Sequence, residues 1–255
     1  RSNSDKEFAD IHKLDLTDLK SKIGEWKSKL LAEREKRKSP RLDDKILTSW
    51  NALMLKGYVD AYRVFDDNHL LTIAIKNASF IEDKLIKKDG SLFRSYKNKE
   101  STINAYLEDY ATLIDAYISL YEASLEEKWL ILCKRLMDYT FEHFYDKNSN
   151  MFFFTSDVDS QLIAKKTELE DNVIPASNSI MANNLLKLGH LFGDKNYLKI
   201  SRQMVHNMVP IIESYPSSYS NWITVYSNLS SSFYEVAILG EDAIQKIKDI
   251  NKEYI

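Results

Sequence analysis

The sequence contains little glycine, proline or cysteine, with six, four and one of these among its 255 residues. It contains neither the glycine-rich loops that cradle nucleotide phosphates nor the Gly-x-Ser-x-Gly turn of serine hydrolases. The single cysteine, Cys133, excludes a disulfide within the chain, and its apolar surroundings, WLILCKRLM, predict that it packs in the core. The sequence therefore gives no support to nucleotide-binding, serine-hydrolase or disulfide-stabilised proteins.

The sequence also lacks an excess of one charge and any long apolar run. Its net charge of −3 provides no electrostatic footprint for nucleic acid, and no stretch reaches the ~18 apolar residues of a membrane-spanning helix. The basic run 34–38 falls where a helix is expected to end, and cations there complement the helix dipole. No His, Cys or Asp cluster has metal-ligand spacing. We expect a cytoplasmic globular protein without a metal or cofactor, in keeping with 44% apolar and 29% charged residues.

The sequence does contain a long internal repeat. Three times an acidic pair precedes an apolar, helix-like run, and the second acids of these pairs, Asp44, Asp109 and Asp171, lie 65 and 62 residues apart. A turn and a more amphipathic helix follow each run. Short β-prone segments follow two of the repeats, near 92–96 and 151–155. A fixed period of this kind indicates a repeat architecture.

Two unlike helices in each repeat predict two layers, with the apolar helices inside and the amphipathic helices outside. This pattern is typical of an all-α protein of the α/α toroid type, in which each inner helix starts at the mouth of a central cavity. A closed ring of six hairpins needs about 350 residues, so 255 residues predict a partial ring. Near the C-terminus, 233–240 is predicted to be a short buried strand and 241–255 a helix.

Three sequence blocks resemble a known family. They are RLDDKILTSWN (41–51), LEDYA (107–111) and DNVIPASNS (171–179). Their order and spacing resemble the C-terminal part of the YyaL-type proteins, which include the spermatogenesis-associated thioredoxin-like proteins. This family joins an N-terminal thioredoxin-like domain to a helical toroid similar to N-acylglucosamine 2-epimerase and the six-hairpin glycosidases. The resemblance implies that residues 1–255 are the C-terminal part of the toroid, with the thioredoxin-like domain and the first hairpins outside this chain.

The repeated acids are the first candidates for a site in this cavity. Sugar hydrolysis usually needs two carboxyl groups, and repeat-equivalent positions should point alike, so the candidate catalytic residues are Asp44, Asp109 and Asp171. Candidate ligand-binding residues offer hydrogen bonds or aromatic faces, and they are Asp43, Trp50, Asn51, Arg94, Glu108, Tyr110, Asn172 and Asn178. Each acid can equally be a helix cap, because capping and the helix dipole favour acids at a helix start.

The sequence leaves three functions open. The toroid can bind a carbohydrate-like ligand with glycosidase-type acid–base chemistry, serve as a non-catalytic scaffold for a ligand or partner, or resemble an N-acyl-sugar epimerase. Epimerisation requires a base such as histidine, and none of the five histidines lies in the three blocks. Two carboxylates facing one cavity about 5–10 Å apart would favour hydrolysis, whereas carboxylates held by backbone N–H groups or arginine would favour a scaffold. Exposed ends of a partial ring also predict self-association.

Overall fold

The alternation of helix-forming runs and turns produces a chain that is 63% helical. The computed structural model describes residues 3–159, 164–234, 236 and 238–252. The chain divides into two units, Arg1–Asp44 and Lys45–Ile255.

The first unit contains two helices with strong local start signals. In α1 (Asp5–His12), the side chains of Ser4 and Glu7 form a reciprocal capping box. In α2 (Leu16–Glu35), the side chain of Asp15 accepts hydrogen bonds from two N–H groups of the first turn. The end of α2 at Glu35 confirms that the basic run 34–38 lies at a helix terminus.

The second unit contains three helical hairpins. They are α3 (Thr48–Phe65) with α4 (Asn68–Lys84), α5 (Leu107–Ser124) with α6 (Lys128–His143), and α7 (Ser177–Leu191) with α8 (Lys195–Ser214). Local chemistry sets their turns, because Asp66 and Leu125 end α3 and α5 in the left-handed conformation. The side chains of Asp67 and Asp194 then cap α4 and α8.

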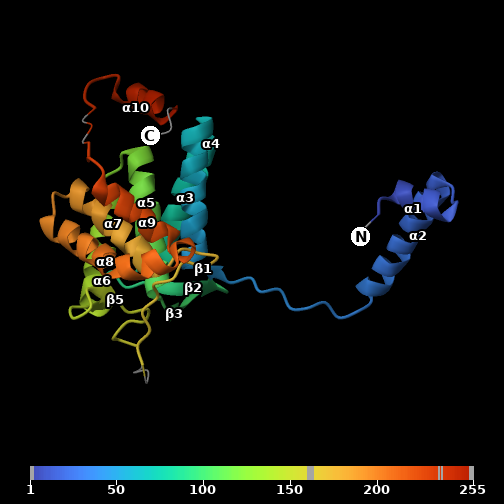
Figure 1. Ribbon diagram of the computed structural model, residues 1–255, viewed down its shortest axis with the longest axis horizontal. Helices are drawn as coiled ribbons and strands as arrows, with labels where there is room; N and C mark the ends of the chain where they lie inside the picture. Colours follow the sequence, from blue (N-terminus) through green and yellow to red (C-terminus); the bar gives the residue numbers. More distant parts are fainter. Residues whose placement is uncertain (1–2, 160–163, 235, 237, 253–255) are drawn as a thin grey trace. The chain divides into compact units, whose positions relative to one another are not determined.

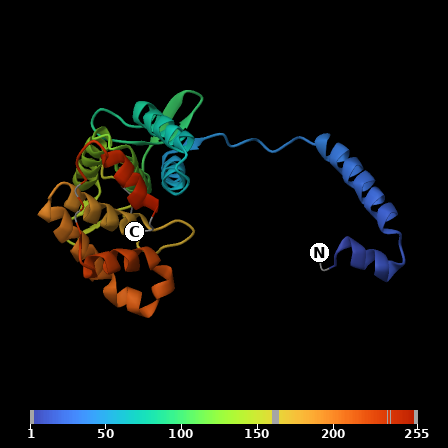
Figure 2. The same cartoon turned by 90° about the horizontal axis from the view of Figure 1, so that it is seen from above.

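Two of the three predicted inner helices are more buried than the outer helices. Twelve of the 18 residues of α5 and 11 of the 15 residues of α7 are buried, against three of 17 in α4, six of 16 in α6 and six of 20 in α8, whereas the inner helix α3 has only six of 18. Inner helices α3, α5 and α7 pack side by side in this order, and α9 (Ser220–Ser230) packs against α7 and α8. Seen from above, the hairpins follow one another round an arc from teal through green to orange (Figure 2). Cys133 is buried in this core, as predicted.

Two small sheets confirm the predicted β segments near 92–96 and 151–155. The strands β1 (Ile46–Leu47), β2 (Phe93–Lys97) and β3 (Glu100–Asn104) form an antiparallel sheet in this order, and β4 (Tyr145–Asp146) pairs with β5 (Met151–Phe152). Strand β1 was not predicted. It pairs Leu47 with Ser95 and lies directly before α3, so the larger sheet sits at the end of the unit where α3 begins (Figure 1).

The C-terminal segment differs from its prediction in one part. A buried strand was predicted over 233–240, of which residues 235 and 237 lie outside the described residues. The other residues of this segment form no strand, and most of its large apolar side chains are exposed, for example Tyr234 at 81% and Leu239 at 84%. The helix predicted after it is present as α10 (Ala243–Lys252), which contacts α3 through an ion pair of Lys248 with Asp66. A short 3-10 turn, η1 (Pro216–Ser218), precedes α9.

Candidate functional site

Asp109 lies in the first turn of α5 and is fully buried. One of its oxygens accepts a hydrogen bond from the backbone N–H of Ser49 in α3 at 3.0 Å. The other accepts hydrogen bonds from the backbone N–H of Tyr106 and from Nη1 of Arg94, both at 3.0 Å. Asp109 therefore caps its own helix, caps the neighbouring inner helix and holds strand β2 to both.

Opposing effects act on the pKa of the Asp109 carboxyl. Burial raises the pKa of the Asp109 carboxyl, while the Arg94 guanidinium and the N–H groups of Tyr106 and Ser49 act to lower it. Three donors occupy most of the lone pairs of one carboxylate. Since the side chain also has no exposed surface, its present geometry serves the fold rather than a ligand.

Arg94 and Glu108, both predicted to bind ligand, lie beside this carboxylate and face each other. Nη1 of Arg94 is 3.6 Å from Oε2 of Glu108, and the guanidinium carbon lies 4.7 Å from the ring centroid of Tyr106. The side chains of Arg94 and Glu108 are 21% and 17% exposed. Two acids thus neutralise one arginine at this end of the unit.

Asp171 plays a similar part in the loop before α7. Its Oδ1 accepts hydrogen bonds from the backbone N–H of Ala176 at 2.9 Å and the hydroxyl of Ser179 at 3.0 Å. Its Oδ2 accepts from the backbone N–H of Asn221 at 2.9 Å, and its own N–H donates to the carbonyl of Ser218. Asp171 therefore joins the starts of α7 and α9.

The two repeat-equivalent acids share one structural device. Asp109 binds the N–H of Ser49, the second residue of α3, and Asp171 binds the N–H of Asn221, the second residue of α9. Each carboxylate fills a donor that a helix start leaves free. The carboxylates are thus held by backbone N–H groups and arginine, the arrangement expected of a scaffold.

Asp43 and Asp44 do not occupy the position predicted for them. Helix α3 begins at Thr48 rather than directly after the acidic pair, because 46–47 pair with β2 as a strand. The helix has Leu47 as its N-cap, without a side-chain cap, and Asp109 supplies the missing acceptor. Asp43 and Asp44 are exposed residues of the first unit.

Trp50 and Asn51 lie in the first turn of α3, as predicted. The side chain of Asn51 donates to the carbonyl of Leu47 at 2.8 Å, so it closes the start of the helix. Trp50 is 61% exposed, and it does not line the cavity described below.

Three other candidates also bind backbone groups. The hydroxyl of Tyr110 accepts from the N–H of Leu92 at 2.8 Å, and burial raises the pKa of this tyrosine. Asn178 is fully buried and exchanges hydrogen bonds with both backbone groups of Phe152 at 2.9 Å. Asn172 is exposed and accepts from the N–H of the next residue. Tyr110 and Asn178 thus fix β segments to the inner helices.

A cavity of about 140 Å³ lies between α3, α5, α7 and α9. Its polar lining comprises Lys56 of α3, Thr112 and Asp115 of α5, Ser179 and Asn183 of α7, and Asn221 and Thr224 of α9. Of the predicted residues, Asp171 is linked to the cavity through its side chain, which binds both Ser179 and Asn221, and Glu108 and Asp109 are linked through their carbonyls, which accept from the hydroxyl of Thr112. Asp171 therefore positions two walls of the cavity.

A partly buried ion triad at the cavity was missed by the sequence analysis, which assigned the bodies of the inner helices to the core. Oδ2 of Asp115 lies 2.5 Å from Nζ of Lys56, and Oδ1 lies 3.3 Å from Nζ of Lys187. Burial acts to raise the pKa of Asp115, but the ammonium groups of Lys187 and Lys56 outweigh it and hold the pKa below its usual range. Each of the three inner helices α3, α5 and α7 thus contributes one charge.

Asn183 provides an unused acceptor in the cavity wall. Its Oδ1 is buried and has no hydrogen-bond partner among the described residues. Most buried polar atoms in folded proteins are paired, so each exception calls for a ligand, a water or a functional reason. The hydroxyls of Thr112 and Thr224 donate to carbonyls of their own helices, which leaves their lone pairs as further acceptors.

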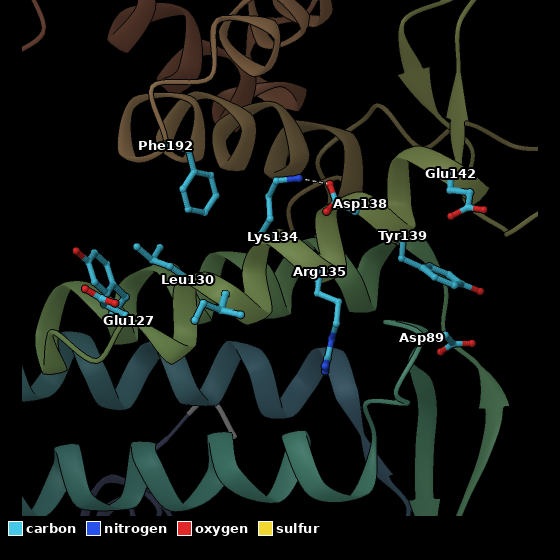
Figure 3. A pocket seen from close by; sticks show the side chains of 11 residues that line it. Asp89, Glu127, Leu130, Lys134, Arg135, Asp138, Tyr139, Glu142 and Phe192 are labelled. Carbon is cyan, nitrogen blue, oxygen red and sulfur yellow. Dashed lines mark hydrogen bonds and ion pairs between the residues drawn. The ribbon is translucent and has the colours of Figure 1, made fainter.

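A larger hollow of about 580 Å³ runs along the outer face of α6 (Figure 3). Figure 3 shows Lys134 and Asp138 pointing toward one another, and they form an ion pair. Most of its lining comes from this one outer helix, so it is an open groove rather than an enclosed site. The smaller cavity, which lies between α3, α5, α7 and α9, is the better candidate.

Two further searches of the described part of the chain were negative. No group of three or more His, Cys, Asp or Glu side chains in it could hold a metal ion. None of its helices combines the length and apolar character needed to span a membrane.

Comparison with models of known protein families finds no match. In sequence, the chain is 31% identical to an uncharacterised protein of Caenorhabditis elegans over 222 residues, covering 82% of this chain and 30% of that protein. It is 30% identical to human spermatogenesis-associated protein 20 over 195 residues, covering 72% of this chain and 25% of that protein. The chain thus spans about a quarter to a third of the length of these relatives.

Solved structures with the same fold share little sequence with the chain. An α-mannanase of Bacteroides thetaiotaomicron matches with a TM-score of 0.59 and 14% identity, covering 85% of this chain and 58% of that chain. The cellobiose 2-epimerase of Bacillus thermoamylovorans matches with a TM-score of 0.54 and 16% identity, covering 66% and 45%. These findings confirm the predicted α/α toroid fold and the resemblance read from the three sequence blocks.

Proposed function

Because the chain is homologous to spermatogenesis-associated protein 20 and folds as an α/α toroid, we propose that its inner-helix cavity binds a carbohydrate-like ligand. Two neighbours of the same fold are named as an α-mannanase and a cellobiose 2-epimerase, and both names refer to sugars. Similarity of fold alone does not identify a substrate, so the proposal depends on the chemistry of the cavity.

The unpartnered oxygen of Asn183 is the observation that carries the proposal. A ligand hydroxyl could donate a hydrogen bond to this buried acceptor, and no existing hydrogen bond of the oxygen would have to break. The ion pair of Lys56 with Asp115 adds a donor and an acceptor on the neighbouring helices. A hydroxyl-rich ligand matches such mixed donors and acceptors better than an apolar one.

The size of the cavity limits the ligand. Drug-sized molecules occupy pockets of about 300–1,000 Å³, and this cavity has about 140 Å³. We therefore propose that the described unit takes one sugar ring or part of one, and that any longer chain extends beyond it.

The residues that line the cavity favour binding of a sugar over its hydrolysis. Glycosidase-type chemistry usually needs two carboxyl groups, and Asp115 is the one acidic residue in the cavity lining, which contains no histidine. Catalytic roles for Asp44, Asp109 and Asp171 stay predictions, and the backbone bonds of Asp109 and Asp171 favour the scaffold alternative. An epimerase-like reaction would need a base from outside this lining.

The activity of the whole protein is a separate proposal. The relatives are about three to four times as long as the matched region, and a thioredoxin-like domain outside this chain stays a prediction. We propose that the toroid acts there as a ligand-binding module beside a thioredoxin-like domain.

Saturation-transfer NMR and calorimetry on the full chain test the proposed binding. The probes are glucose, mannose, N-acetylglucosamine and N-acetylmannosamine. We expect at least one to bind, and we expect Asn183→Leu, which keeps the volume but removes the amide, to weaken that binding at least about tenfold. Asn196→Leu, at an exposed position of α8, is the matched control.

Two results would overturn the proposal. One is a folded wild-type chain that binds none of these sugars at millimolar concentration. The other is sugar binding that Asn183→Leu and Asn196→Leu leave equally strong.

A further inference from the structure

The side-chain amide of Asn183, in the cavity wall, is unpaired at both of its ends. Its Oδ1 is buried without a partner, and its Nδ2 takes part in none of the hydrogen bonds of the described residues. A carboxamide carries its acceptor and its donors in one plane. Asn183 therefore offers one acceptor and one donor side by side to the occupant of the cavity.

Two neighbouring hydroxyl groups of a sugar ring match this pair. Equatorial hydroxyls on adjacent ring carbons also stand side by side, so one can donate to Oδ1 of Asn183 while the other accepts from Nδ2. The N–H and C=O of a trans N-acetyl amide point in opposite directions, so such a group cannot meet both ends at once. The amide of Asn183 thus favours a vicinal diol over an N-acetyl group.

The charges at the cavity cancel. Lys56 and Asp115 lie in the lining, Lys187 pairs with Asp115, and the carboxylate of Asp171 binds two lining residues. Two ammonium groups and two carboxylates sum to zero. A charged ligand would enter this partly desolvated site without a counter-charge, so a neutral ligand is favoured.

The remaining walls suit the faces of a single ring. Leu53 of α3, Ile180 of α7 and Val225 of α9 provide apolar surface beside the polar groups. A sugar ring likewise combines apolar C–H faces with an edge of hydroxyls, and binding pockets commonly join apolar walls to a few polar groups. The volume of about 140 Å³ leaves little room for a bulky substituent on the ring.

We propose that the cavity selects a neutral pyranose without an N-acyl group, and that Asn183 binds two adjacent hydroxyls of its ring. This inference rests on the proposed function, since it names the class of sugar that the same cavity takes. A chain that binds sugars with another selectivity would overturn this inference and leave the proposed function standing.

Calorimetry of the full chain at pH 7 tests the selectivity. The probes are glucose, mannose and, for each, the amino, N-acetylamino and uronic acid derivatives. Whichever of glucose and mannose binds better should bind at least about tenfold more tightly than its three derivatives, because these add a charge or an acyl group. A derivative that binds as tightly as its parent sugar would contradict the selection of a neutral, unsubstituted ring.

Deoxy sugars test the role of Asn183. Every pair of adjacent ring hydroxyls loses a member in the 2-deoxy or the 3-deoxy form of the sugar, so at least one form should bind about tenfold more weakly than the parent. In Asn183→Ala this difference should fall below about threefold, because the amide that reads the diol is gone. The melting temperature of this variant should not fall, since the amide has no hydrogen bond to lose. Asn196→Ala, at an exposed position of α8, should keep the full difference.

The possible results separate the two proposals. If the parent sugar and both deoxy forms bind equally, or if Asn183→Ala keeps the tenfold difference, Asn183 does not bind a diol and this inference is wrong, although sugar binding itself is then established. If no sugar binds the folded wild-type chain, the proposed function is wrong, and this inference is overturned with it.

Discussion

At the scale of single residues, Asp109→Asn separates a structural carboxylate from a catalytic one. Asparagine can keep one acceptor for the N–H of Ser49, but its amide NH₂ then faces two donors, the N–H of Tyr106 and the guanidinium of Arg94. The buried amide NH₂ and the donors that face it would then lack acceptors, which should lower the free energy of unfolding by about 2–3 kcal/mol. Urea unfolding of the full chain measures this loss.

Asp60→Asn, at an exposed position of α3, is the control for Asp109→Asn and should change stability little. A variant at Asp109 that keeps its stability but loses ligand turnover would show that the carboxylate is catalytic and that the interpretation of its hydrogen bonds is wrong.

Asp115 makes stability depend on pH in a defined direction. Its pKa in the folded state is depressed, so its contribution is fully present above the unfolded-state pKa of about 4 and is lost as pH falls through the folded-state pKa. Asp115→Asn leaves Lys56 and Lys187 without their carboxylate. Because these lysines are 36% and 32% exposed, solvent screening limits the expected loss at pH 7 to about 1–3 kcal/mol.

Urea unfolding of the wild type and of Asp115→Asn at pH 7 and pH 3 measures this dependence. The difference in the free energy of unfolding should narrow at pH 3. A difference that is the same at both pH values would contradict the assignment of the depressed pKa to Asp115.

The sequence located Asp109 but could not supply its role. The repeat and the capping preference predict an acid at the start of α5, and the structure has it there. Its main partner, Ser49, is 60 residues away along the chain, and no local pattern encodes that distance. The triad left a signal that was overlooked, because Lys56, Asp115 and Lys187 are charges near the middle of largely apolar helices.

At the scale of elements, the loop before α7 holds α9 in place. Oδ2 of Asp171 accepts from the N–H of Asn221, and the carbonyl of Leu169 accepts from Nε1 of the buried Trp222. Asp171→Ala should therefore open the start of α9. We expect amide hydrogen exchange over 220–230 to become at least about tenfold faster, while exchange in α5 stays unchanged.

Glu170→Ala is the matched control for Asp171→Ala, since Glu170 is the exposed neighbour of Asp171 in the same loop. Equal exchange rates for α9 in both variants would show that Asp171 does not hold this helix.

Helix existence was predictable from periodicity, whereas one helix start was not. The acidic pair 43–44 is a good local start signal, yet α3 begins only at Thr48. Pairing of Ile46 and Leu47 with Tyr96 and Ser95 makes a strand of the intervening residues, and this long-range contact overrides the capping preference. Local signals decide boundaries where no distant strand competes for the same backbone.

At the scale of the molecule, the repeat predicted the ring of hairpins, but it did not reveal that the chain divides into two units. The sequence predicts helices at both α2 and the inner helices, yet α2 has one buried residue, Leu19, and α5 has twelve. Burial depends on neighbours that a single helix pattern cannot identify. The boundary at Asp44 falls within a block that resembles a known family, which made it look continuous with the toroid.

This difference in burial predicts where the chain is cleaved first. Residues 36–45 are exposed and contain no helix or strand, and they include five sites for trypsin, which are Lys36, Arg37, Lys38, Arg41 and Lys45. Chain segments with few buried contacts open most easily, so brief digestion should cut here and in α2 before it cuts any inner helix. Mass spectrometry should then find a long-lived fragment that begins between residues 37 and 46 and keeps the cooperative melting of the second unit. Early cleavage within α5 or α7 would show that the burial of the inner helices does not protect them, and it would contradict the layered arrangement on which the cavity depends.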